Sequence, residues 1–71
     1  MANMRQVNQH IKANFPDLHI EAVRGDGYVY FVGVDGYGKV DSIFSNPPTT
    51  STADMVDMCL ENIDEYVREN A

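Results

Sequence analysis

The chain has 71 residues, a net charge of −6 and a single cysteine, with 44% hydrophobic and 23% charged residues. This length and composition predict one small globular domain over residues 1–71, which buries only about 60% of its unfolded surface. One cysteine excludes an internal disulfide, and His10, His19 and Cys59 lack the spacing of a metal site. Oligomerisation is the remaining common way to stabilise so short a chain.

The N-terminal residues, MANMRQVNQH, contain no apolar run, so we expect no signal peptide. The sequence has no stretch of 18 consecutive apolar residues, so we expect no membrane span. A free cysteine without an export signal indicates a cytoplasmic protein.

The negative charge is concentrated near the C-terminus. Residues 1–50 carry five acidic and four basic side chains, whereas residues 51–71 carry six acidic side chains and one arginine. The net charges of the two segments are therefore −1 and −5. An acidic segment repels phosphate backbones, so we expect no binding to double-stranded DNA.

The first predicted element is a helix over residues 3–14. Its apolar residues, and the one just after it, recur at the helical spacings of three and four, at Met4, Val7, Ile11 and Phe15. Pro16 disfavours helical geometry at the residue before it, so the helix should end by Asn14 or Phe15.

A β-hairpin should follow. Residues 18–24 alternate apolar and polar side chains, as a strand does, and a second strand is predicted over residues 28–34. Asp26-Gly27 between them is a strong signal for a two-residue turn with positive φ at both positions. Arg24, Gly25 and Asp26 also spell a tripeptide that extracellular adhesion ligands display. Turn geometry accounts for the glycines, and a cytoplasmic location argues against adhesion.

The rest of the chain completes an α+β fold. A second turn over residues 35–38 leads to a third predicted strand over residues 39–45, and such short loops allow only an antiparallel meander. Pro47 and Pro48 interrupt regular structure. Ser51 and Asp54 fit a capping box, which predicts a final helix from about Thr52 to residue 68. We therefore predict an α-β-β-β-α order with both helices packed on one face of the sheet and a core containing Val7, Ile11, Ile20, Phe31, Phe44, Leu60 and Ile63.

The predicted register gives the sheet two different faces. A two-residue turn places Ala22 opposite Phe31 and Arg24 opposite Val29, on the face toward the helices, which Val40 and Phe44 should join. The other face carries Val23, Tyr28, Tyr30, Val32 and Ile43, which is too apolar for an idle solvent-facing surface. Three possibilities stay open: a homodimer interface, a site for a partner protein, or a helix folded over this face.

The sequence offers little that indicates catalysis. Ser42, Ser45, His10 and His19 are present without a nucleophile motif, and the glycine-rich GVDGYG lacks the lysine and following helix of a phosphate loop. We expect no catalytic residue, no metal site and no cofactor.

Two surfaces could instead bind a partner. Tyr28 and Tyr30 could stack on the nucleobases of a single-stranded nucleic acid. Arg24 and Lys39 are, however, the only positively charged side chains expected nearby. The final helix has an acidic face, which is either a solvated surface or an imitation of a row of phosphates that occupies a basic groove of another protein; its residues are Asp54, Asp57, Glu61, Asp64, Glu65 and Glu69.

The segment FPDLHIEAVRGDGYVYFVG resembles a group of short orphan proteins from bacteriophages, plasmids and other mobile elements of bacteria. Their shared feature is a Gly-acid-Gly-Tyr-x-Tyr-Phe hairpin, matched here by Gly25, Asp26, Gly27, Tyr28, Tyr30 and Phe31. The resemblance extends over residues 15–66, although the tryptophan often found in the last helix of that group is missing. It implies a third strand, a closing helix and a mobile-element origin, where small acidic proteins often inhibit host nucleic-acid machinery.

Together these observations predict a non-enzymatic, small acidic protein-binding module that modulates a host protein and can form a homodimer. The alternative is a single-stranded nucleic-acid binder that uses the aromatic sheet face.

Overall fold

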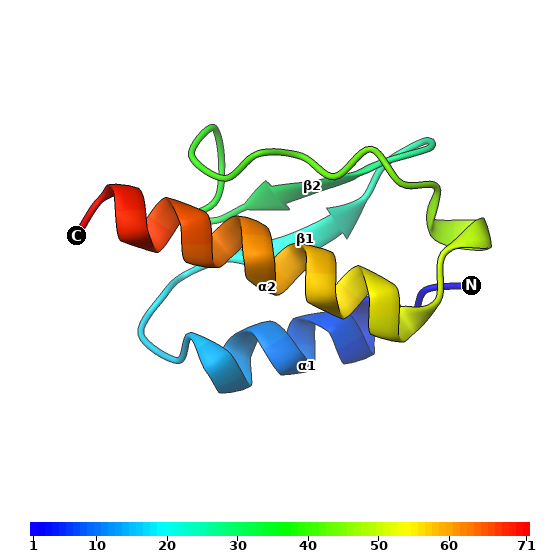
Figure 1. The fold of residues 1–71 in the computed structure, drawn as a ribbon, viewed down its shortest axis with the longest axis horizontal. Helices are drawn as coiled ribbons and strands as arrows, with labels where there is room; N and C mark the ends of the chain where they lie inside the picture. The colour runs from blue at the N-terminus through cyan, green and yellow to red at the C-terminus, as the bar shows by residue number, and fades with distance from the viewer.

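The computed structural model describes residues 1–71 and confirms the α+β class. In chain order it contains two helices, a two-stranded antiparallel sheet and a short 3-10 helix: α1 (Met4–Asn14), β1 (Glu21–Arg24), β2 (Val29–Val32), η1 (Pro47–Thr49) and α2 (Thr52–Glu69). Both helices lie on one side of the hairpin, and the loop from β2 to η1 returns along the hairpin's other edge (Figure 1).

The first helix ends at the predicted residue and begins one residue later than predicted, because local signals set both of its ends. The Asn3 side chain caps its start by accepting a hydrogen bond from the Gln6 N–H over 3.2 Å. Its last helical residue, Asn14, comes two positions before Pro16. Val7 and Ile11 are buried, as the spacing predicts.

The second helix begins at the predicted residue, Thr52. The Ser51 hydroxyl caps it by accepting from the Asp54 N–H over 3.1 Å. The Asn3 N–H donates to the Thr52 hydroxyl over 2.9 Å, so the two helices start next to each other. Neither helix is long and apolar enough to cross a lipid bilayer.

The hairpin has the predicted register, with Ala22 opposite Phe31 and Arg24 opposite Val29. The turn differs in detail, because Gly27 has a φ of 84° whereas Asp26 keeps a negative φ, the pattern of a type II turn. The prediction of two positive φ angles is therefore wrong. Gly25 leaves room for the Tyr28 ring: a Cβ there would lie 2.6 Å from that ring, which would have to move.

The predicted third strand is wrong. Over residues 39–45 only Ile43 pairs with β2, through two backbone hydrogen bonds of 2.8 and 2.9 Å with Val29. The reason lies at Asp35, whose N–H donates to the His19 carbonyl over 3.1 Å while its carboxylate accepts from the His19 N–H over 2.7 Å. Turns then continue to Val40 and use residues that a strand would need.

The core lies between the helices and one face of the hairpin. Of the predicted core residues Val7, Ile11, Phe31 and Ile63 are buried, and Ile20 and Leu60 are half-buried against them. Phe44 is a wrong prediction, since it is 87% exposed. Without a continuous strand there is no strict alternation, and the core positions go to Val40 and Ile43, which are 7% and 6% exposed.

Candidate interaction surfaces

Four of the five residues predicted for the open sheet face lie there. Val23, Tyr28, Tyr30 and Val32 are half-buried and belong to the side of the hairpin opposite Ala22, Val29 and Phe31. None of the four packs against the core cluster, and both helices lie on the other side of the hairpin (Figure 1). The possibility of a covering helix is therefore wrong. Ile43, the fifth residue, is buried in the core because it bridges to Val29.

Phe44 takes the place of Ile43 and completes a row of three aromatic rings. The Tyr28 and Tyr30 rings lie 5.8 Å apart between centroids, and Phe44 stacks on Tyr28 at 6.2 Å with an angle of 28° between the ring planes. We call this face the aromatic surface; its residues are Val23, Tyr28, Tyr30, Val32 and Phe44. The sequence alone indicated two of the rings, and the third depends on the turn that replaces the strand.

The acidic residues of α2 are all exposed. Positions 54, 57, 61 and 64 follow helical spacing, so their side chains form one stripe about 15 Å long. One ion pair lies within it, between Asp64 and Arg68 at 3.2 Å. The stripe is present as predicted, and its role as a phosphate mimic stays a prediction. We call it the acidic stripe; its residues are Asp54, Asp57, Glu61, Asp64 and Glu65.

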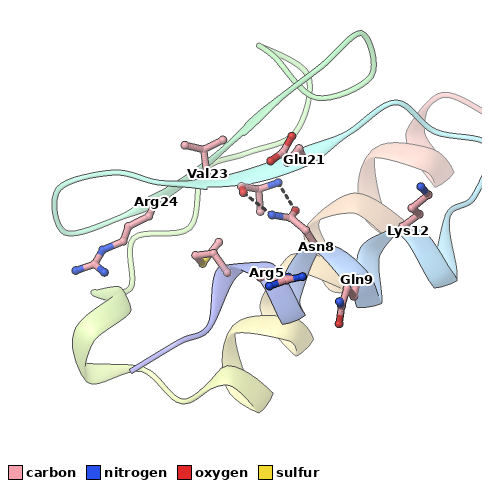
Figure 2. A pocket seen from close by; sticks show the side chains of 9 residues that line it. Arg5, Asn8, Gln9, Lys12, Glu21, Val23 and Arg24 are labelled. Carbon is pink, nitrogen blue, oxygen red and sulfur yellow. Dashed lines mark hydrogen bonds between the residues drawn. The ribbon is translucent and has the colours of Figure 1, made fainter.

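A groove separates α1 from the outer edge of β1 (Figure 2). Its volume is about 530 Å³, and it is lined by Met4, Arg5, Asn8, Gln9, Lys12, Glu21, Ala22, Val23 and Arg24. We call it the edge groove. The sequence did not predict it, because Arg5, Gln9 and Lys12 read as the solvated side of an amphipathic helix and nothing in their spacing shows which strand lies beside them.

Asn8 fixes the helix to the strand at this groove. Its side-chain oxygen accepts from the Ala22 N–H over 2.8 Å, and its side-chain nitrogen donates to the Ala22 carbonyl over 2.9 Å (Figure 2). A neighbouring β-strand would satisfy the same two backbone groups in the same way. The amide therefore occupies the free edge of β1 at Ala22 and holds α1 parallel to that edge.

Positive charge collects in the edge groove. Three of the five basic residues of the chain, Arg5, Lys12 and Arg24, line it, and none of them is in an ion pair. Figure 2 shows Arg24 and Lys12 near its two ends with Arg5 between them. The single acidic residue of the lining, Glu21, stands with Val23 on the other side of the strand (Figure 2).

Cys59 has no exposed atom through which it could act as a nucleophile. It lies fully buried on α2, and burial raises the pKa of its thiol to about 12. The thiol therefore stays neutral near pH 7 and contributes to packing.

No three His, Cys, Asp or Glu side chains are grouped so that they could hold a metal ion.

No family model, curated protein or solved structure matches this chain. Function is therefore inferred from the aromatic surface, the acidic stripe and the edge groove.

Proposed function

We propose that the chain is a non-enzymatic protein-binding module that docks its partner on the aromatic surface. The observation that carries this proposal is Phe44, which is 87% exposed and yet stacked in a row with two tyrosines. Folded domains rarely leave contiguous large apolar side chains in water, and aromatic residues supply much of the binding energy of protein interfaces.

The charges near this surface favour a protein over a nucleic acid. The aromatic surface contains no lysine or arginine, and Glu21 stands beside Val23 on the same side of β1 (Figure 2). Single-stranded nucleic acids need cations that follow their phosphates. One observation supports this second candidate: Val23 belongs to both the aromatic surface and the edge groove, so the cations of the groove lie one strand away from the rings.

The class of partner to test first comes from the resemblance to mobile-element proteins. Small acidic proteins of that origin often inhibit host proteins that handle nucleic acids. The acidic stripe of α2 suits such a partner, because carboxylates in a row can occupy a groove that normally accepts phosphates. Since α2 and the aromatic surface are on opposite sides of the hairpin, a host protein could use either one separately (Figure 1).

Affinity capture from bacterial lysate with mass spectrometry tests the proposal. Tagged wild-type protein should capture a partner that the Phe44→Ser variant loses. Tyr37→Ser is the matched control, because Tyr37 is 76% exposed and lies outside the aromatic row. Equal capture by both variants would contradict docking on the aromatic surface.

Titration with a labelled oligothymidylate at low salt separates the two candidates. The proposal predicts weak binding that Phe44→Ser does not change. Tight binding that is sensitive to salt and lost in Phe44→Ser would instead establish the single-stranded nucleic-acid function.

A further inference from the structure

We propose that the edge groove is a second binding site, which accepts an extended acidic segment of a protein. In this site two carboxylates of the segment contact the groove cations. The inference does not depend on the aromatic surface, because it rests on Arg5, Lys12 and Arg24, none of which belongs to that surface.

Charge complementarity is the first argument. The groove lining holds three bases and one acid, a net of +2, in a chain whose net charge is −6. The remaining residues therefore carry −8. No acid of the chain neutralises these cations, since the one ion pair joins Asp64 and Arg68, and Arg5, Lys12 and Arg24 form none. An anionic ligand would find its attractive potential concentrated at this one place.

The shape of the groove selects an extended chain. Arg5 and Lys12 are seven residues apart on α1, which separates their backbones by about 10 Å along the helix axis. An extended peptide covers that length with three residues. Alternate side chains of an extended peptide share one face, so two carboxylates at alternate positions can both turn toward the groove cations.

Recognition must come from side chains. A peptide could otherwise add to the edge of β1 as a further strand. Asn8 already uses the N–H and carbonyl of Ala22, so the ladder is blocked in the middle of the strand. The ligand is therefore recognised through its carboxylates.

A nucleic acid fits the groove less well than an acidic peptide. None of the lining residues is aromatic, so an unpaired base has no ring to stack on inside the groove. A phosphate chain would also continue beyond the groove onto a surface that is strongly acidic as a whole. A short peptide can end its charges within the groove.

Titration by NMR with a defined peptide tests the site. The probe is an acetylated and amidated hexapeptide of alternating glutamate and leucine, and its control has glutamine in place of glutamate. At low salt the glutamate peptide should shift backbone amides within residues 4–12 and 21–24, and the glutamine peptide should not. No shifts at millimolar peptide, or shifts centred on the aromatic surface, would overturn the proposal.

A pair of double variants separates site-specific from general attraction. Arg5→Gln/Lys12→Gln and Lys39→Gln/Arg68→Gln both change the net charge from −6 to −8, but Lys39 and Arg68 lie outside the groove. The first should weaken peptide binding about tenfold, and the second by less than about twofold. Equal weakening would overturn the proposal.

Two further measurements distinguish the edge groove from the aromatic surface and from a nucleic-acid site. The Phe44→Ser variant should bind the peptide as the wild type does, so failure of this site and failure of the aromatic surface are distinguishable. An oligothymidylate should not displace the peptide at equal charge concentration. Displacement with shifts in the same groove would assign the site to nucleic acid and overturn the peptide proposal.

Discussion

Gly33, the residue after β2, is under a tight backbone constraint. It has a φ of 100°, and a Cβ at this position would overlap the carbonyl oxygen of His19. Gly33→Ala should therefore lower the free energy of unfolding by about 3 kcal/mol, since both strain and a backbone clash oppose it. Gly27→Ala is the control, because Gly27 has a φ of 84° with open space around it, and it should cost about 1 kcal/mol. Urea unfolding measures both, and equal costs would contradict the contact with His19.

Cys59 should make stability depend on pH in the alkaline range. Burial raises the pKa of its thiol from 9.0 to about 12 in the folded chain, so the folded state holds its proton where the unfolded state loses it. The contribution is complete below pH 9 and falls by about 1.4 kcal/mol per pH unit between pH 9 and 12. Urea unfolding of wild type and Cys59→Ala at pH 8, 10 and 11 should show their difference shrinking as pH rises. A constant difference would mean that the thiol is exposed.

The same burial protects the thiol from reagents. A disulfide reagent at pH 8 should leave the native chain unmodified and react once urea unfolds it, because the thiolate is the reactive species. Rapid modification without denaturant would contradict the packing of Cys59 on α2.

At the scale of elements, the segment after β2 gives the sharpest test of the fold. Ile43 is 6% exposed and Phe44 is 87% exposed. The predicted third strand requires the reverse, with Phe44 buried in the core and Ile43 on the open face. Ile43→Ala should lower the free energy of unfolding by about 2–4 kcal/mol, and Phe44→Ala should change it by less than about 0.5 kcal/mol. Chemical denaturation compares the two variants. A larger loss of unfolding free energy for Phe44→Ala than for Ile43→Ala would instead support the predicted three-stranded meander.

Both helices and the hairpin register could be predicted because their signals are local. Ser51 caps α2 from the adjacent position, and Asp26-Gly27 sets the pairing of strands only a few residues away. The third strand could not be judged in this way. Whether this strand forms depends on the hydrogen bonds between Asp35 and His19, which is 16 residues earlier. The spacing of apolar residues gives no indication of such a contact.

The candidate sites also differ in whether they depend on local signals or on contacts between distant residues. Tyr28, Tyr30 and the acids of α2 follow from spacing within one element. The edge groove requires α1 to lie beside β1, and that placement depends on Asn8, whose partner Ala22 is 14 residues away. A polar residue on a helix gives no sign in the sequence that it will pair with a strand.

At the scale of the whole molecule, we predict a homodimer through the aromatic surface at high micromolar concentration. The domain is small, so its own stability is a few kcal/mol, and covering several hundred Å² of apolar surface at about 25 cal/mol per Å² is large beside that. The acidic stripe lies on α2, on the other side of the hairpin, and does not oppose this contact directly (Figure 1).

Light scattering measures the assembly. Wild type should have the mass of a dimer, and Tyr30→Glu should be a monomer because it would bury a charge in the interface. Tyr37→Glu adds the same charge outside the aromatic row and should stay dimeric. A monomeric wild type would leave the surface free for a foreign partner, whereas a dimer would require that partner to compete with self-association.

The amide of Asn8 has a consequence for how this chain behaves at high concentration. A two-stranded sheet has an exposed outer edge, which can template strands of other copies into fibrils. Asn8 blocks this edge at Ala22, because its side chain occupies the N–H and the carbonyl that another strand would pair with. One substitution at this position would therefore expose an edge from which ordered aggregates can grow, even in a chain whose helices still form.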